Sequence, residues 1–296
     1  MTSFRVVGVI GKRREPNVEL LRELTGTLKE LGCEVLVETH SALKSLDVPS
    51  VDRQELGQRC DLVVVVGGDG TLLDAGRSLA STSVRLLGVN QGRLGFMVDV
   101  APEAMRENLA AIIGGSFETE DRLLLSATVE RPGVRDGAPR LAVNDVVVRN
   151  QTTLRMIEFE TWLEGEFISH HRADGVIVAS PTGSTAYALS GGGPLLHPGL
   201  SAIALVPICP HTLSDRPIVV PDDRAIRLVI RGVDRAQAMA TFDGQMSETL
   251  EAGDVVEIKR AAYPMRLIHP AGYSYFAILR NKLRWGSGPE TRLERA

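Results

Sequence analysis

Five residues in the first third of the chain, Gly67-Gly68-Asp69-Gly70-Thr71, combine residue types that suit phosphate chemistry. They follow a run of apolar residues at 62–66 and precede a helical pattern at 71–80. Glycines lack the Cβ atoms that would block a close approach, so backbone N–H groups can turn toward a phosphate chain at the positive end of the helix. Thr71 could cap that helix or hydrogen-bond a phosphate. The sequence therefore predicts phosphate binding at Gly67, Gly68, Gly70 and Thr71.

Asp69 is the unexpected member of this loop, because a carboxylate repels phosphate unless it has a task there. It could hold Mg²⁺, or it could accept the proton of an attacking hydroxyl while a phosphoryl group is transferred. The alternative is a glycine-rich turn whose aspartate only caps the helix. The chain contains no GxxxxGK[ST] pattern, and no GxGxxG follows Gly8 or Gly67. These absences exclude a Walker-type phosphate loop and the usual dinucleotide fingerprint.

A second group of polar residues lies in a later, strand-rich region. Asn144 and Asp145 interrupt an apolar strand pattern at 141–149, and a ligand's hydroxyl or base edge would satisfy such a buried pair. The alternative is a turn or a structural hydrogen bond. Arg172 and Asp174, just before the apolar run 176–179, are typical of a pair that binds an anion and a hydroxyl. The neighbouring His170 and His171 do not suggest a metal site, because adjacent side chains of a strand point to opposite faces.

The segment 181–193, PTGSTAYALSGGG, concentrates hydroxyl side chains near an expected helix start and contains no charged residue. Such a surface could hold a neutral or anionic ligand through hydroxyl groups and backbone. Helix capping followed by a flexible loop explains the same residues equally well.

Two periodicities indicate how these residues are positioned. Strand patterns at 5–11, 33–39, 62–66 and 85–89 alternate with helical patterns at 16–31, 71–80 and 101–113, which predicts a doubly wound, Rossmann-like α/β domain. Short strand patterns then dominate, with expected hairpin turns at 136–137 and 164–165. We expect an α/β domain over 1–118, a β-rich, sandwich-like domain over 119–270, and a helical tail over 271–296 that packs back on the α/β domain.

Composition narrows the class of protein. The 296 residues are 44% hydrophobic and 24% charged, and the net charge of −4 lacks the basic excess of a nucleic-acid binder. No run of about 20 apolar residues predicts a membrane helix. Three scattered cysteines predict neither a disulfide framework nor a zinc site. The opening residues reverse the order of a signal peptide, so we expect a cytoplasmic protein.

Taken together, these motifs resemble the bacterial NAD kinase family. The resemblance rests on GGDGT at 67–71, GVNQGRLGF at 88–96, VNDVVV at 143–148, ADGVIVASPTGSTAYALSGGGP at 173–194 and DGQ at 243–245. GGDGT alone is shared with lipid kinases and phosphofructokinase-type kinases, whereas the long segment at 173–194 narrows the resemblance to NAD kinases. The implied reaction transfers the terminal phosphoryl group of ATP, or of polyphosphate, to the 2′-hydroxyl of the adenosine ribose of NAD.

The resemblance also implies roles for individual residues. Asp69 would be the catalytic base, with Gly70 beside the substrate. The NAD site would be lined by Asn144, Asp145, Arg155, Arg172, Asp174, Thr185, Ala186, Tyr187, Ala188, Leu189, Ser190 and Gln245. Many relatives have Glu where this chain has Asp145, so we expect the same contact with a different reach. The resemblance further implies use of ATP with a divalent cation, and a homodimer or homotetramer. The sequence itself offers no rich Asp/Glu cluster for a metal site built from protein side chains alone, so we expect Mg²⁺ to arrive with ATP, held mostly by phosphates and water.

Two other functions fit parts of the pattern. A lipid or sphingoid kinase would share GGDGT, but it predicts an apolar entrance or a membrane-binding helix, which the sequence does not offer. A non-catalytic NAD(P)-sensing module would keep the fold, but it has no use for Asp69.

Overall fold

The computed structural model describes residues 4–39, 46–82, 84–92, 95–133, 137–151, 156–232 and 238–285. The chain divides into two compact units. The first unit comprises the residues up to Glu120 together with those from Arg266 onward, and the second comprises Asp121–Met265. The chain thus leaves the first unit close to the expected boundary at 118, and it returns to that unit ahead of residue 270.

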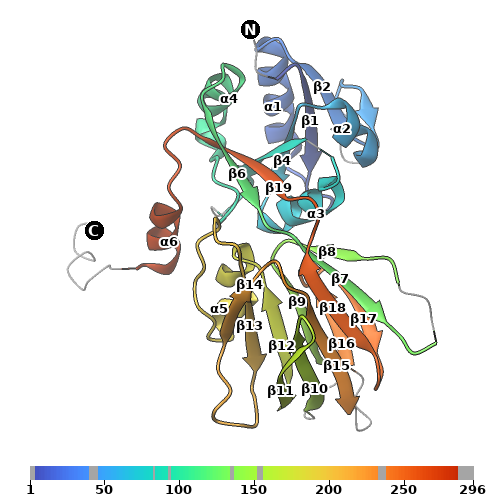
Figure 1. Cartoon of the computed structure of the whole chain (residues 1–296). Coiled ribbons are helices and arrows are strands. Elements are labelled where there is room, and N and C mark those ends of the chain that lie inside the picture. Colours follow the sequence, from blue (N-terminus) through green and yellow to red (C-terminus); the bar gives the residue numbers. More distant parts are fainter. Residues whose placement is uncertain are drawn as a thin grey trace. The chain divides into compact units, whose positions relative to one another are not determined.

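The first unit contains a seven-stranded sheet in which β3, β2, β1, β4, β5 and β19 pair in parallel (Figure 1). Its strands in the described part of the chain are β1 (Val6–Gly11), β2 (Glu34–Glu38), β3 (Ser50–Val51), β4 (Leu62–Gly67), β5 (Arg85–Asn90), β6 (Phe117–Arg122) and β19 (Met265–Pro270). They are ordered β3-β2-β1-β4-β5-β19-β6. Every residue of β4 is buried, as expected of an apolar strand covered on both faces.

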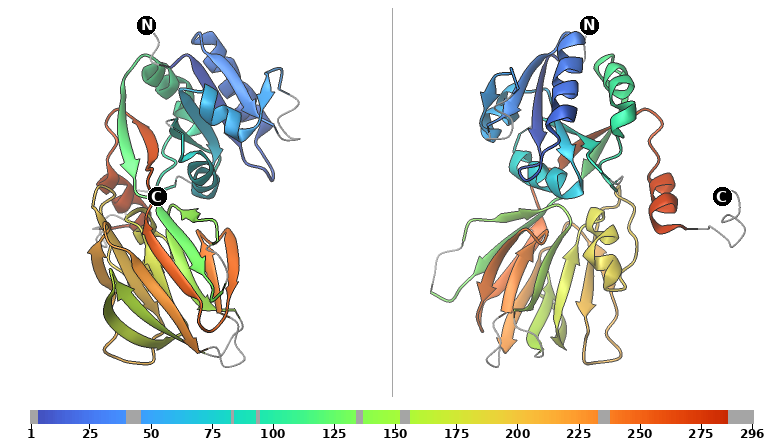
Figure 2. Two further views of the ribbon diagram at one scale, coloured as in Figure 1. Left: turned by 45° about the vertical axis from the view of Figure 1, so that its right-hand side comes forward. Right: turned by 180° about the vertical axis from the view of Figure 1, so that it is seen from behind.

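Helices cover both faces of this sheet. They are α1 (Val18–Glu30), α2 (Arg53–Arg59), α3 (Asp69–Leu79), and the short 3₁₀ helix η2 (Pro102–Ala104) with α4 (Met105–Ile113). A further helix, α6 (Tyr275–Leu283), follows β19 in the chain. Figure 2 shows α1 and α4 side by side, and their buried leucines share one core with alternate strand residues such as Val7 and Val64. On the other face, Gly8 approaches Leu56 of α2, and α2 packs on α3. This arrangement is the predicted doubly wound fold.

The second unit is a sandwich of two antiparallel sheets. One sheet, ordered β11-β10-β15-β18-β7-β8, contains β7 (Leu125–Glu130), β8 (Arg140–Ala142), β10 (Ile157–Leu163), β11 (Glu166–Ala173), β15 (Ile226–Gly232) and β18 (Val255–Arg260). The other, ordered β14-β13-β12-β9-β16-β17, contains β9 (Asp145–Asn150), β12 (Gly175–Ala179), β13 (Ala202–Ile208), β14 (Ile218–Pro221), β16 (Ala238–Phe242) and β17 (Met246–Leu250). Alternate residues of both sheets, such as Phe159 and Val178, form the core between them.

The outer face of the second sheet is covered as well. Ile177 and Ala179 of β12 pack there with Ala188 and Leu196. These last residues belong to the segment that carries the 3₁₀ helix η3 (Thr182–Thr185) and the short helix α5 (Tyr187–Ser190). The apolar strand β12 is therefore buried on both faces, and the hydroxyl-rich segment is part of the fold.

The predicted fold class, an α/β unit followed by a β-rich unit, is confirmed. The sequence patterns did not predict the elements α2, β3, β6, β13, β17 and β19. The single strand predicted over 141–149 is wrong, because the structure divides it into β8 and β9, which belong to different sheets. None of the helices in the described part of the chain is long and apolar enough to span a membrane.

Candidate functional site

The GGDGT loop is a tight turn between β4 and α3. Gly68 is the N-cap residue of α3, and Asp69 is already the first helical residue, two positions earlier than predicted. Thr71 therefore lies inside the helix and is not its cap. A Cβ at Gly67 would lie 2.5 Å from the Thr71 hydroxyl oxygen, so only glycine allows this side chain to fold back over the end of the strand.

The Asp69 carboxylate is held by the backbone of residues 96–98. Its Oδ2 accepts a hydrogen bond from Phe96 N at 2.8 Å, and its Oδ1 accepts from Met97 N at 3.1 Å and Val98 N at 3.2 Å. A Cβ at Gly95 would lie 2.1 Å from Oδ1, so this position must be glycine for the contact to form. Asp69 thus does not cap its own helix, and its carboxylate is fixed in orientation.

A cavity of about 430 Å³ lies in the first unit beside this loop. It is lined by Lys12, Gly68, Gly70, Thr71, Asn90, Gln91 and Gly92. Gly68, Gly70 and Thr71 were predicted as phosphate-binding residues, whereas Lys12, Asn90 and Gln91 were missed. A usable signal was present, because Lys12 and Asn90 follow or end strands adjacent to β4, and the carboxyl ends of parallel strands meet at one sheet edge.

Asn144 and Asp145 lie where the chain passes from β8 to β9. The carboxylate of Asp243 accepts hydrogen bonds from the backbone N–H groups of Val143 (3.0 Å), Asn144 (2.7 Å) and Asp145 (3.2 Å). Asp243 itself has a positive φ of 52°, in the turn between β16 and β17. Asp243 thus holds the backbone at this polar pair, and the side chains of Asn144 and Asp145 line the cavity described below.

The hydroxyl groups of the 180–185 segment mostly hold the segment itself. Ser184 Oγ accepts from Leu196 N at 2.9 Å, and Thr185 Oγ1 donates to Thr182 O at 3.0 Å. Ser180 Oγ accepts from Gly183 N at 3.1 Å. A Cβ at Gly183 would lie 2.0 Å from Asn144 O, so glycine allows the segment to lie directly against the β8–β9 crossing.

A cavity of about 390 Å³ in the second unit collects several predicted residues. Its lining comprises Asn144, Asp145, Val147, Arg149, Ala186, Tyr187, Thr241, Asp243 and Gly244. Asn144, Asp145, Ala186 and Tyr187 were predicted for the NAD site. Arg149, Thr241 and Asp243 were missed, although DGQ at 243–245 marked the place of the last.

The other predicted NAD-site residues do not line this cavity. Ala188 is fully buried and packs against the sheet, and Arg172 has 63% of its side chain exposed at 3.9 Å from Glu158. Asp174 follows β11, and its backbone O accepts from Asn150 N. Arg155 lies outside the described residues. The remaining members of the predicted set that lie outside the lining are Thr185, Leu189, Ser190 and Gln245.

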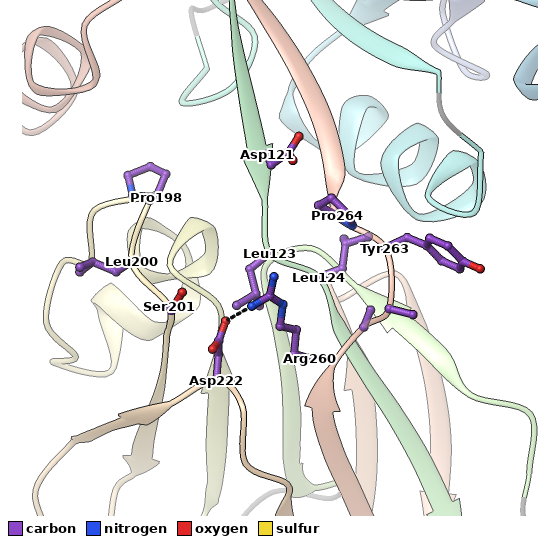
Figure 3. Close-up of a pocket in the computed structure, with 13 residues that line it drawn as sticks. Asp121, Leu123, Leu124, Pro198, Leu200, Ser201, Asp222, Arg260, Tyr263 and Pro264 are labelled. Carbon is purple, nitrogen blue, oxygen red and sulfur yellow. Dashed lines mark hydrogen bonds and ion pairs between the residues drawn. The ribbon is translucent and has the colours of Figure 1, made fainter.

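A further cavity of about 140 Å³ in the second unit holds none of the predicted residues (Figure 3). Arg260 extends toward Asp222 there, with Nη1 3.2 Å from Oδ2. The main charged pair of this lining is thus already satisfied, and we assign this cavity no role.

Among the carboxyl groups that line the cavity of about 390 Å³ in the second unit, that of Asp145 has the pKa that departs most from its ordinary value. Its side chain is buried, and the nearby Asp243 carboxylate adds a like charge. Burial, and to a lesser extent Asp243, raise the pKa of Asp145 to about 7. Asp145 can therefore exchange a proton near neutral pH.

Replacing Asp145 by Asn is expected to remove a pH dependence of stability. An unfolded aspartate releases its proton near pH 3.9, whereas folded Asp145 keeps it up to about pH 7. Within this window the folded state binds more protons, so the free energy of unfolding falls as pH rises, by about 1.4 kcal/mol per pH unit where the slope is steepest. Urea titrations at pH 5, 6.5 and 8 measure this slope. The free energy of unfolding of Asp145→Asn should depend less on pH than that of the wild type, and the exposed control Asp223→Asn should retain the wild-type slope. Equal slopes in all three proteins would contradict the raised pKa of Asp145.

Comparison with known proteins identifies the family of the whole chain. Residues 7–117 match the family model of the ATP-NAD kinase N-terminal domain, and residues 143–270 match that of the ATP-NAD kinase C-terminal domain. The chain is 44% identical over 290 residues to the NAD kinase of Chromohalobacter salexigens, covering 97% of this chain and 99% of the relative. It is likewise 44% identical to the NAD kinase of Nitrosococcus oceani, covering 96% and 97% of the two chains.

Solved structures show the same fold. Yeast NADH kinase complexed with NADH matches with a TM-score of 0.88 at 24% identity, covering 96% of this chain and 89% of that one. An NAD kinase from Archaeoglobus fulgidus in complex with ATP matches with a TM-score of 0.72 at 28% identity, covering 95% and 98%. The resemblance suggested by the motifs is thereby confirmed, and the chain belongs to the ATP-NAD kinase family.

Proposed function

We propose that this protein is an NAD kinase, a phosphotransferase that moves the terminal phosphoryl group of ATP to the 2′-hydroxyl of the adenosine ribose of NAD, giving NADP. The observation that carries the proposal is the Asp69 carboxylate, held in a single orientation at the start of α3 beside a glycine-lined cavity. Family membership supports the same activity, because the relatives that match nearly the full length of the chain are NAD kinases.

Asp69 acts as the general base in this proposal. A ribose hydroxyl is a poor nucleophile at neutral pH, so a carboxylate within about 2.6–3.2 Å can accept its proton as the new P–O bond forms. A carboxylate offers about four acceptor positions. Met97 and Val98 use those of Oδ1, and Phe96 uses one of Oδ2. Among the described donors, one acceptor position on Oδ2 is left for the ribose hydroxyl.

The first cavity supplies the environment for the phosphate chain. The positive end of the α3 dipole points to it, and Lys12 adds a positive charge. The described residues include no group of three or more His, Cys, Asp or Glu side chains that could hold a metal ion. We therefore propose that Mg²⁺ is delivered with ATP, held mostly by phosphate oxygens and water, where it screens phosphate charge.

The second cavity supplies contacts for NAD. Asn144 offers an amide, Asp145 offers a carboxyl group, and the exposed ring of Tyr187 offers a stacking surface. Contacts from the other predicted residues rest on the family resemblance alone: Arg155, Arg172, Asp174, Thr185, Ala188, Leu189, Ser190 and Gln245. The resemblance also supports a cytoplasmic location and a homodimer or homotetramer. Light scattering of the purified protein would measure the oligomeric state.

A coupled assay tests the activity directly. Purified protein is incubated with NAD, ATP and Mg²⁺, and an NADP-specific dehydrogenase reports the product. We expect NADP to form. If ATP gives no NADP, the assay is repeated with polyphosphate as donor. Absence of NADP with either donor, together with tight NADP binding, would replace the proposal with a sensing module.

Replacing Lys12 by Met is expected to raise the KM for ATP about tenfold and to leave the KM for NAD within about twofold. The reason is that a charge-assisted hydrogen bond to phosphate contributes about 1.5–3 kcal/mol. Steady-state kinetics with each substrate varied measures both constants. Lys29→Met is the matched control, because Lys29 lies on α1 and donates to Asp47 O. Equal KM values for ATP in wild type and Lys12→Met would exclude Lys12 from the phosphate site.

A further inference from the structure

His269 is a buried histidine between two carboxylates in the first unit. Its ring is 1% exposed, with Nδ1 2.9 Å from Asp99 Oδ2 and Nε2 3.1 Å from Glu120 Oε2. Asp99 follows β5, Glu120 belongs to β6, and His269 itself belongs to β19. The ring of Tyr273 stacks on the imidazole, with centroids 3.8 Å apart and planes 15° apart.

Both ring nitrogens must carry protons to donate to both carboxylates, which makes the side chain an imidazolium. Burial by itself lowers the pKa of His269, but the hydrogen bonds to Asp99 and Glu120 outweigh burial and raise this pKa. Among the described residues, Asp99 and Glu120 hydrogen-bond to the ring, and the aromatic ring of Tyr273 stacks on it. His269 therefore keeps its positive charge to a higher pH than an ordinary histidine does.

Asp99 directly continues the backbone that holds Asp69. It follows Val98, whose N–H donates to Asp69 Oδ1, and precedes Val100, which is bridged to Val89 of β5. Its second carboxylate oxygen, Oδ1, is buried and accepts no hydrogen bond from the described residues. The buried charge of Asp99 thus depends on His269 for its neutralisation.

We propose that His269 is a positioning residue for the transfer reaction: through Asp99 it fixes the backbone of residues 96–98, and through these amides it fixes the carboxylate of Asp69. The proposal rests on the proposed role of Asp69 as base. His269 does not touch the reacting atoms, and its effect is on the orientation of the group that does. The path from β19 to the base consists of the hydrogen bond from His269 to Asp99, the adjacent residue Val98, and the hydrogen bond from Val98 N to Asp69.

Steady-state kinetics gives the first test. His269→Gln and Asp99→Asn are each expected to lower kcat about tenfold and to leave the KM values for NAD and ATP within about twofold, because a slightly misplaced base slows the chemical step without weakening binding. Leu109→Ala is the control, since Leu109 is fully buried in the same unit on α4. It should lower stability without lowering kcat. An unchanged kcat in both test variants, or an equal loss of kcat in Leu109→Ala, would overturn the proposal.

Hydrogen exchange gives a second test that needs no activity. Amide exchange of Phe96, Met97 and Val98 should be about tenfold faster in His269→Gln and in Asp69→Asn, while the amides of α1 remain unchanged. The double variant should exchange no faster than the faster single variant, because both substitutions release the same backbone. Accelerations that multiply in the double variant, or acceleration throughout the unit, would show that His269 acts only on general stability.

The two tests separate this proposal from the proposed function. If the wild-type protein forms no NADP, the function fails, but coupled exchange would still show that His269 controls the backbone around Asp69. If NADP forms and the exchange of residues 96–98 is unaffected by His269→Gln, only the positioning role fails.

Discussion

Replacing Asp69 by Asn is expected to lower kcat for NADP formation by about 10²–10⁴-fold, the usual contribution of a general base. An amide cannot accept the ribose proton at neutral pH. The amide nitrogen would also face an N–H donor, since Phe96, Met97 and Val98 all donate to this carboxylate. Loss of one accepted hydrogen bond at a partly buried site should destabilise the fold by about 1–3 kcal/mol. The coupled assay measures kcat, and urea denaturation measures the second effect.

Gly95→Ala tests the same assignment without changing Asp69. The new Cβ would lie 2.1 Å from Asp69 Oδ1 and 2.8 Å from Oδ2, so the carboxylate must move. We expect a lower kcat with NAD binding retained. Gly26→Ala on α1 is the matched control, because a Cβ there would meet no described atom within 4 Å. Full activity in folded Asp69→Asn and in Gly95→Ala would rule out Asp69 as the base.

Replacing Gly183 by Ala is expected to be the most damaging change in the second unit. The Cβ would lie 2.0 Å from Asn144 O, 2.5 Å from Asn144 C and 2.8 Å from Asn144 Cα. All three are backbone atoms, so no flexible side chain can move aside. We expect the free energy of unfolding to fall by about 3 kcal/mol, at the upper end of the range for overpacking. Separation of Asn144 from the segment that carries Tyr187 should also lower kcat/KM for NAD by about 100-fold.

Calorimetry and steady-state kinetics measure the two effects of Gly183→Ala. Gly199→Ala is the matched control in the same unit, because its Cβ would meet only the His197 ring, at 3.4 Å. The control should keep wild-type stability and kinetics. A Gly183→Ala protein with the wild-type KM for NAD would show that the β8–β9 crossing does not shape the NAD site.

Much of the fold follows from local patterns in the sequence. The five apolar residues of β4 ended by two glycines predict a buried parallel strand, and the structure buries all of it. The expected turn at Glu164-Gly165 joins β10 and β11, and both residues have positive φ. Helix α2 was missed because its seven residues are mostly polar, with Leu56 as its main buried side chain. A pattern that short carries too little periodicity to be distinguished from a loop.

The candidate site was only partly predictable for a different reason. Asp69 and the glycines around it are adjacent in sequence, so their types and spacing indicate phosphate chemistry directly. The groups that orient them are distant: Phe96 lies 27 positions from Asp69, and Asp243 lies 99 positions from Asn144. Gly95 and Asp243 lie within the quoted motifs GVNQGRLGF and DGQ, but neither was predicted as a site residue, because the contact that each one serves is with a distant segment.

By itself, the sequence determined that an α/β unit is followed by a β-rich unit and that a buried strand leads into GGDGT. It also determined the class of reaction and the family. Only the tertiary structure decided that β19 returns to the first sheet beside β5, that residues 141–149 divide between two sheets, and that the amides of 96–98 hold the base. The physical reason is that periodicity and turn chemistry depend on near neighbours, whereas strand order and the donors around a carboxylate depend on which distant segments pack together. The orientation of Asp69 is therefore a property of the folded chain.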